Sequence, residues 1–215
     1  MSRKQIVHSC SEMERQGLTR GSSGNISTRT ETGFLVTPSG MPALAMVQDD
    51  IVHMDMAGNA TGRRKPSSEW RFHRDIYAAR PEIGAIVHCH APFGIALASH
   101  GHGIPAFHYM VAMAGGTDIR CAPYATYGTQ ELSDHAVRAL EGRFACLLAN
   151  HGMIACGKNL ERAMALAVEV ESLAEGYWRA LQIGEPILLD DAEMAVVIEK
   201  FKSYGANAQK EEKTA

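Results

Sequence analysis

Residues 84–90 read Gly-Ala-Ile-Val-His-Cys-His, a short apolar run that ends in two histidines. An apolar run of this length is typical of a buried β-strand, in which successive side chains point to opposite faces. We therefore expect His88 and His90 to share one face and Cys89 to point the other way. Two imidazoles side by side at the end of a strand can supply two ligands to a metal ion.

A second apolar run, residues 145–149, leads through Asn150 to His151. If the two strand ends meet, three imidazoles surround one point and leave a coordination position open, as in catalytic rather than structural zinc sites. A histidine that only satisfies hydrogen bonds in the core is the alternative for each ring. Other histidines lack such a setting and are expected at the surface or in packing roles: His53, His73, His100, His102 and His135.

The composition excludes several classes of protein. The chain has 215 residues and a formal net charge of −3 with a pI near 6.4, which argues against nucleic-acid binding. No apolar stretch of about 18 residues is present to span a membrane, and no signal-peptide core follows Met1-Ser2-Arg3-Lys4. The five cysteines are scattered and form no Cys-x-x-Cys pair, so we expect reduced thiols and a cytoplasmic location.

Strand patterns and amphipathic helix patterns alternate irregularly along the chain, with no internal repeat and no long linker. A helix is expected to begin at residues 66–68 (Pro-Ser-Ser) and to continue to Arg80. The mixture predicts a single α/β domain over residues 1–215. Within it, residues 206–215 are polar and are expected to form a mobile tail.

Glu69 directly follows the serines at the start of this predicted helix. A glutamate in the first helical turn favours the helix dipole, and that role alone would explain it. If the helix start faces the metal site, the carboxylate becomes a fourth ligand or a general base, because a nearby cation tunes its pKa. The sequence leaves both roles open.

Three loops are rich in small hydroxyl and amide groups: residues 21–25, 37–40 and 67–68. Such groups, together with the free N–H groups of a helix start, can bind phosphate, although they also favour plain turns. None of the loops matches a P-loop or a dinucleotide fingerprint, so a nucleotide is not indicated. Tyr109 is either a packed core residue or a proton donor, and Tyr204 either finishes the last helix or closes over a site.

Together these motifs resemble the zinc-dependent class II aldolases that cleave sugar phosphates. The resemblance extends from about Arg3 to Tyr204. Its motifs are Gly-Ser-Ser-Gly-Asn-Ile-Ser (21–27), Thr-Pro-Ser-Gly (37–40), Lys-Pro-Ser-Ser-Glu-Trp-Arg-Phe-His (65–73), Ile-Val-His-Cys-His (86–90), Ile-Pro-Ala-Phe-His-Tyr-Met (104–110), Cys-Ala-Pro-Tyr-Ala-Thr-Tyr-Gly-Thr (121–129) and Asn-His-Gly (150–152). Within the family, their combination is most similar to the bacterial enzymes that act on L-fuculose 1-phosphate.

The resemblance implies a fold and an assembly. Family members have a three-layer α/β/α sandwich with a largely antiparallel central sheet. They form four-fold tetramers with sites at the subunit interfaces, so a homotetramer is expected here. Tyr127 and Tyr204 correspond to positions around the aldehyde end of the pocket.

The resemblance also implies a site. His88, His90 and His151 correspond to the ligands of one zinc ion per subunit. Glu69 corresponds to a residue that approaches the metal in the resting site and acts as acid and base when substrate binds. Tyr109 corresponds to a tyrosine that transfers a proton on the aldehyde side. The positions that correspond to phosphate-binding residues are Ser22, Asn25, Gly40, Ser67 and Ser68.

The implied activity is that of a lyase, which cleaves a ketose 1-phosphate into dihydroxyacetone phosphate and an aldehyde through a zinc-stabilised enediolate. Manganese or cobalt stay open as the metal in the cell. L-Fuculose 1-phosphate, 5-deoxyribulose 1-phosphate and 5-methylthioribulose 1-phosphate are alternative substrates, since Tyr127 stands where the fuculose-cleaving enzymes carry phenylalanine. One polar group at the aldehyde end can decide such selectivity.

Two other functions fit the same resemblance. A sugar-phosphate epimerase or dehydratase shares the fold and the three histidines, but the related 4-epimerases carry aspartate where this chain has Glu69. A non-enzymatic scaffold similar to the adducin head lacks the metal ligands, which this chain retains. A product assay separates the first alternative from an aldolase, and a zinc titration separates the second.

Overall fold

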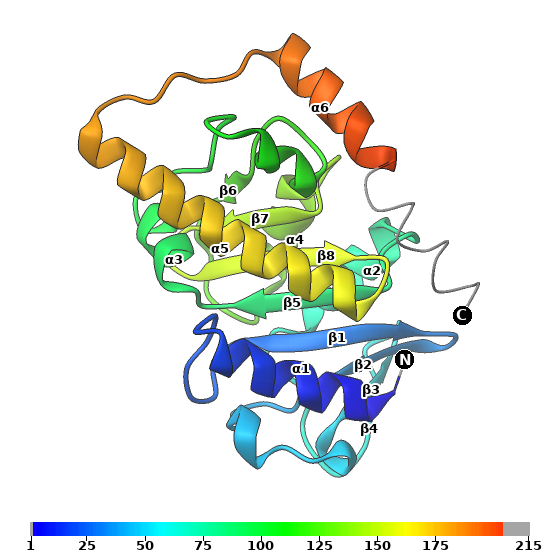
Figure 1. Ribbon diagram of the computed structural model, residues 1–215. Coiled ribbons are helices and arrows are strands. Elements are labelled where there is room, and N and C mark those ends of the chain that lie inside the picture. The colour runs from blue at the N-terminus through cyan, green and yellow to red at the C-terminus, as the bar shows by residue number, and fades with distance from the viewer. Residues whose placement is uncertain (1, 204–215) are drawn as a thin grey trace, which may run out of the picture.

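One eight-stranded sheet forms the centre of the computed structural model, which describes residues 2–203 (Figure 1). Its strands are β1 (Asn25–Thr30), β2 (Gly33–Val36), β3 (Val52–Asp55), β4 (Ala60–Thr61), β5 (Ala85–Cys89), β6 (Arg120–Ala122), β7 (Ala145–Leu148) and β8 (Gly152–Gly157). They lie in the order β4-β3-β2-β1-β5-β8-β7-β6. Among these described strands, β6 and β7 pair in parallel and every other neighbouring pair is antiparallel.

Helices cover both faces of the sheet (Figure 1). On one face pack α1 (Arg3–Arg15), α3 (Pro92–Ala98) and α5 (Leu160–Ile183), and on the other α2 (Trp70–Ala79) and α4 (Gln130–Ala139). The last helix, α6 (Asp191–Ser203), packs against the 3-10 helix η3 (Tyr109–Ala114), and the short η1 (Ala43–Ala45) and η2 (Gln48–Asp50) connect β2 to β3. The predicted three-layer α/β/α sandwich with a largely antiparallel sheet is confirmed.

The side chains of β5 alternate between the two apolar cores, as the sequence predicts. Val87 and Cys89 belong to the core beneath α1, α3 and α5, whereas Ile86 belongs to the core beneath α2 and α4. His88 faces α2, where its ring meets Phe72 edge-on at 5.4 Å between centroids. The alternation therefore directs His88 and Cys89 to opposite faces.

The helix that was predicted to begin at residues 66–68 begins later, at Trp70. The backbone N–H of Ser67 donates to the carbonyl of Thr37 at 2.9 Å, which holds this segment against the neighbouring loop instead of in a helical turn. Glu69 therefore occupies the N-cap position rather than the first turn, and its side chain makes no capping hydrogen bond. Its carboxylate is available to the site described below.

The cysteines agree with a further expectation. All five cysteines are free thiols. Within residues 2–203, no helix combines the length and the apolar character that crossing a bilayer requires. Tyr204 and the tail predicted at residues 206–215 lie outside the described part of the chain.

Candidate active site

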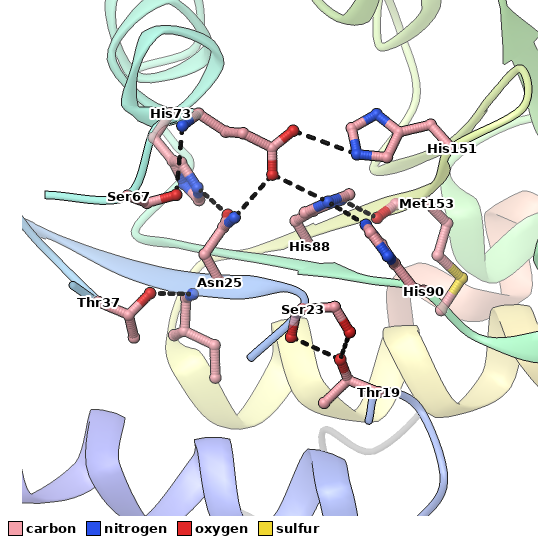
Figure 2. A network of polar contacts seen from close by, with 12 residues as sticks. Thr19, Ser23, Asn25, Thr37, Ser67, His73, His88, His90, His151 and Met153 are labelled. Atoms are coloured by element: carbon pink, nitrogen blue, oxygen red, sulfur yellow. Dashed lines mark hydrogen bonds and ion pairs between the residues drawn. The ribbon is translucent and has the colours of Figure 1, made fainter. Parts of the chain in front are cut away.

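Three histidines meet at one end of the central strands (Figure 2). β5 and β8 are antiparallel with Cys89 opposite Met153, so the last residues of β5 lie beside the first residues of β8. His88 belongs to β5, His90 directly follows it, and His151 lies in the turn between β7 and β8. The ring centroids of His88 and His151 are 4.8 Å apart, and those of the other two pairs are 5.0 Å apart. Strand pairing thus brings together side chains that are distant in the sequence.

The turn that presents His151 depends on the residues on either side of it. Asn150 has a φ of 54°, a left-handed conformation that asparagine adopts more readily than most other residues. A Cβ atom at Gly152 would lie only 2.4 Å from the carbonyl oxygen of Cys89. The close approach of the two strands therefore requires glycine here, which explains two of the three residues in the Asn-His-Gly motif.

The carboxylate of Glu69 faces the histidines. Its Oε2 lies 3.2 Å from Nε2 of His88, and its Oε1 lies 3.2 Å from Nε2 of His151. Oε1 is buried and makes no hydrogen bond despite this short separation. Nε2 of His90 lies 3.2 Å from Nε2 of His88. Three imidazole nitrogens and one carboxylate thus converge on one point.

This donor set fits a divalent metal ion. Ligand atoms about 2.0–2.1 Å from a tetrahedral ion lie about 3.3–3.4 Å from one another, close to the separations of 3.2 Å found here. Nδ1–H of His88 donates to the carbonyl of Met153 at 2.9 Å, which leaves Nε2 with its lone pair toward the site. A cation would also satisfy the orphaned Oε1 of Glu69. The three histidines and Glu69 can therefore hold zinc or a similar ion.

Burial and neighbouring charges set the ionisation of these groups. Burial raises the pKa of Glu69, but the close approach of the His88 and His151 rings outweighs burial and lowers this pKa below its ordinary range. Burial lowers the pKa of His90 to about 4, helped by the charges of the other two rings. Burial also acts to lower the pKa of His88, but the negative charge of Glu69 outweighs burial, so the pKa of His88 is raised. A bound cation would compete with the proton that the raised pKa favours on His88, because a metal-bound imidazole is neutral.

A cavity of about 270 Å³ opens over this cluster. Glu69, His90 and His151 line it, and the fully buried His88 lies behind them. The lining also includes every position that the sequence motifs indicate for phosphate: Ser22, Asn25, Gly40, Ser67 and Ser68. None of the described lining residues is lysine or arginine. The cavity therefore offers neutral hydrogen-bond donors beside a potential metal site.

The structure separates the tyrosines that the sequence singled out. Tyr127 lines the cavity and is 67% exposed. Tyr109 does not line it: this residue is 49% exposed, and its ring stacks on Phe201 of α6 at 6.4 Å between centroids. Tyr109 instead lines a separate cavity of about 600 Å³ between η3 and α6. Tyr204 falls outside the described residues, so its predicted place over the pocket stays a prediction.

Part of the site was not predicted from the sequence. Ser23 and Tyr124 also line the cavity. His73, expected at the surface or in a packing role, is completely buried, and its ring contacts Asn25, whose amide binds Glu69. One signal was present: Glu69 and His73 are four residues apart, a spacing that places two side chains on one face of a helix.

Comparison with known proteins agrees with this geometry. Residues 4–178 match the family described as Class II Aldolase and Adducin N-terminal domain. The chain is 58% identical over 204 residues to the 5-methylthioribulose-1-phosphate/5-deoxyribulose-1-phosphate aldolase of Rhodospirillum rubrum, covering 95% of this chain and 92% of that protein. It is 50% identical over 203 residues to the L-fuculose phosphate aldolase of Escherichia coli, covering 94% of each.

A solved structure of an L-fuculose 1-phosphate aldolase superposes with a TM-score of 0.91 at 42% identity, covering 93% of this chain and 95% of that chain. Fold, motif order and identity over nearly the whole length therefore agree. The chain belongs to the class II aldolase and adducin N-terminal domain family.

Proposed function

We propose that the protein is a metal-dependent aldolase, a lyase that cleaves a ketose 1-phosphate into dihydroxyacetone phosphate and an aldehyde. The observation that carries this proposal is the convergence of three imidazoles and the Glu69 carboxylate in a cavity otherwise rich in neutral donors. The relatives named above are aldolases of phosphorylated sugars, which supports the same reaction class. We further propose that residues 1–215 act as a single domain.

We assign one divalent ion per subunit to the three histidines, with Glu69 as the fourth ligand before substrate binds. Zinc suits this donor set, and manganese and cobalt are the alternatives. The ion would supply a Lewis acid for the negative charge that develops on the three-carbon fragment as the carbon–carbon bond breaks.

Glu69 is proposed to move the proton at the carbon of the three-carbon fragment where the bond breaks. Its lowered pKa keeps it a carboxylate at neutral pH, the form that takes a proton in the synthetic direction. In the cleavage direction the carboxylate first takes a proton from water and then gives it to that carbon. Oε2 is held by the Nδ2 amide of Asn25 at 2.9 Å, whereas Oε1 makes no hydrogen bond. Oε1 is therefore the oxygen that can turn toward substrate.

The phosphate group is assigned to the neutral donors of the cavity. Hydroxyl groups and backbone N–H groups there come from three loops, which contribute Ser22, Asn25, Gly40, Ser67 and Ser68. The N-terminus of α2 adds partial positive charge. Neutral donors, a helix terminus and the site cation together would offset the phosphate charge without a basic side chain.

Tyr109 is proposed to complete the cavity of a second copy. As the acid and base on the aldehyde side it must reach the substrate hydroxyl, yet it lies outside the cavity of its own chain. A homotetramer with sites at its subunit interfaces resolves this conflict. Ile183, the last residue of α5, is 94% exposed, and Ile187, in the segment that joins α5 to α6, is 93% exposed. Such exposed apolar residues are available to an interface.

The remaining aromatic and amide side chains of the cavity are assigned to the aldehyde half of the substrate: Tyr124, Tyr127 and Asn150. The relative with 58% identity is named for 5-methylthioribulose 1-phosphate and 5-deoxyribulose 1-phosphate. These two ketoses are therefore the first substrates to assay, and L-fuculose 1-phosphate is the third.

The test is incubation with each ketose 1-phosphate and detection of dihydroxyacetone phosphate by its NADH-dependent reduction. We expect equimolar release of dihydroxyacetone phosphate and aldehyde from at least one of them, lost after chelation and restored by zinc. An epimerase would return an isomeric phosphate, and a dehydratase would release water without breaking the carbon chain. A scaffold would bind no zinc, and a protein that cleaves none of the three ketoses would refute the proposal.

A further inference from the structure

A continuous series of buried side chains leads from Glu69 away from the cavity, between the sheet and α2. Nδ2 of Asn25 donates to Oε2 of Glu69 at 2.9 Å, and Nε2 of His73 lies 2.6 Å from Oδ1 of Asn25 (Figure 2). On the other side of the ring, Nδ1 lies 2.7 Å from Oγ of Ser27, which lies 2.8 Å from the hydroxyl of Tyr77. We call Asn25, His73, Ser27 and Tyr77 the buried polar chain; none is more than 5% exposed.

Hydrogen-bond chemistry sets the direction of every contact in the buried polar chain. A carboxylate only accepts, so Asn25 turns its amide nitrogen to Glu69 and its oxygen to His73. His73 then carries its proton on Nε2, and its Nδ1 accepts from the Ser27 hydroxyl. The Ser27 oxygen is left to accept from Tyr77. Burial lowers the pKa of His73 to about 3, so the ring keeps the neutral form that this pattern requires.

Burying the polar groups of this chain costs desolvation free energy, and a packing role alone would not require it. Apolar side chains would fill the same space without needing any of these hydrogen bonds. Ser27 and His73 are both completely buried, and neither lines the cavity. The buried polar chain ends on Glu69, the single carboxylate among the described lining residues. Each hydrogen bond in the series fixes the orientation of the next side chain. Together they therefore fix the position of the Glu69 carboxylate.

We propose that His73 is a positioning residue of the site, which holds the Asn25 amide in the one orientation whose N–H binds Oε2 of Glu69. Ser27 and Tyr77 support its ring from behind. The inference rests on the proton-transfer role proposed for Glu69. Without His73, the Asn25 amide can rotate and turn its oxygen to the carboxylate, which would repel Glu69 from its place.

The substitution His73→Met tests this role, because methionine fills a similar volume but cannot donate to Asn25. Misplacing a reacting group by about 1 Å can cost about 10²-fold in rate. We therefore expect kcat, and the exchange of the C3 proton of dihydroxyacetone phosphate with solvent, to fall about 10- to 10²-fold. KM and the binding of inorganic phosphate should change by less than this factor, because the serine and glycine positions assigned to phosphate form no hydrogen bond with His73.

Two variants separate positioning from packing. His73→Gln can donate to Asn25 and accept from Ser27 through its amide, so it should recover most of the exchange rate. His53→Met is the matched control, because His53 lies in β3 outside both the cavity and the buried polar chain. We expect it to exchange at the wild-type rate. A purely structural role would lower the unfolding temperature of His73→Met without changing turnover of the folded fraction.

The tautomer of His73 gives a second measurement that does not involve turnover. Nitrogen-15 NMR of the metal-free protein should show the ring proton on Nε2. A proton on Nδ1 would overturn the proposal, as would wild-type exchange in folded His73→Met. If His73→Met does not fold, the tautomer and the exchange rate of His73→Gln decide the matter.

The positioning role and the proposed function fail in different ways. If the wild-type protein neither cleaves a ketose 1-phosphate nor exchanges the proton of dihydroxyacetone phosphate, the proposed function fails, while the tautomer still reports on the buried polar chain. If the wild-type protein does both and folded His73→Met matches it, only the positioning role fails.

Discussion

Mixing two inactive variants should restore activity if each site is shared between two copies of the chain. Glu69→Gln removes a carboxylate from the cavity that its own chain builds, whereas Tyr109→Phe removes a hydroxyl that lies outside that cavity. Loss of a general acid or base costs about 10²–10⁴-fold in rate. Each variant assembled alone should therefore retain little activity.

The expected recovery follows from how the site is divided. In a random one-to-one assembly, each site draws Glu69 from one copy and Tyr109 from a neighbour. Each group is intact in about half of the copies, so about one quarter of the sites carry both. Activity per subunit should thus reach about a quarter of the wild-type value. If both groups acted within one chain, no site in the mixture would be complete.

The assay uses coexpression of the two variants with different affinity tags, followed by purification through both tags. Release of dihydroxyacetone phosphate is compared with that of a doubly tagged wild-type assembly. Separately purified variants, mixed under conditions that prevent subunit exchange, serve as the control and should stay inactive. Activity no higher than that of either parent would refute the shared site.

Three further outcomes are expected. Glu69→Gln alone should keep its metal but slow exchange of the C3 proton of dihydroxyacetone phosphate about 10²–10⁴-fold, which proton NMR in deuterated solvent measures. Gly152→Ala should cost about 1–3 kcal/mol of stability, because its Cβ would lie 2.4 Å from a carbonyl oxygen of β5; thermal unfolding checks this against Gly176→Ala, whose Cβ would meet nothing closer than 3.4 Å. The pKa of Asp50 is lowered to about 2, first by its hydrogen bond from Arg64. Its contribution to stability is therefore complete above the unfolded pKa of about 3.9 and is lost as the pH falls through the folded value. Asp50→Asn should remove this part of the acid sensitivity in denaturant titrations across that range.

The parts of the site that depend on local backbone geometry could be predicted from the sequence. Alternation along a strand places His88 and His90 on one face whatever the strand packs against. The meeting with His151 could only be conditional, because it requires the β5–β8 pairing, which joins residues far apart in the chain. The start of α2 was misplaced for a similar reason: Ser67 bonds to Thr37 of a distant loop, and this contact keeps the segment out of the helix.

The burial of His73 is a consequence of tertiary structure alone. Its partner Asn25 is 48 positions earlier in the chain, and no periodicity of the sequence connects them. The contact exists because α2 packs on the face of the sheet to which β1 contributes Ser27 and the neighbouring Asn25. Polar residues of this kind are recognised in a sequence only when their partners are known.

The division of the cavity between strands and loops also accounts for how related chains can differ in substrate. Asn25 and His88 are cross-strand neighbours in β1 and β5 at the centre of the sheet, so moving either would disturb the core on both faces. Tyr124 and Tyr127 belong instead to the exposed loop before α4. Changes in that loop can reshape the part of the cavity that we assign to the aldehyde, while the end that holds the three histidines and Glu69 keeps its geometry. Relatives that are 58% and 50% identical to this chain, and are named for different sugar phosphates, are what such a division predicts.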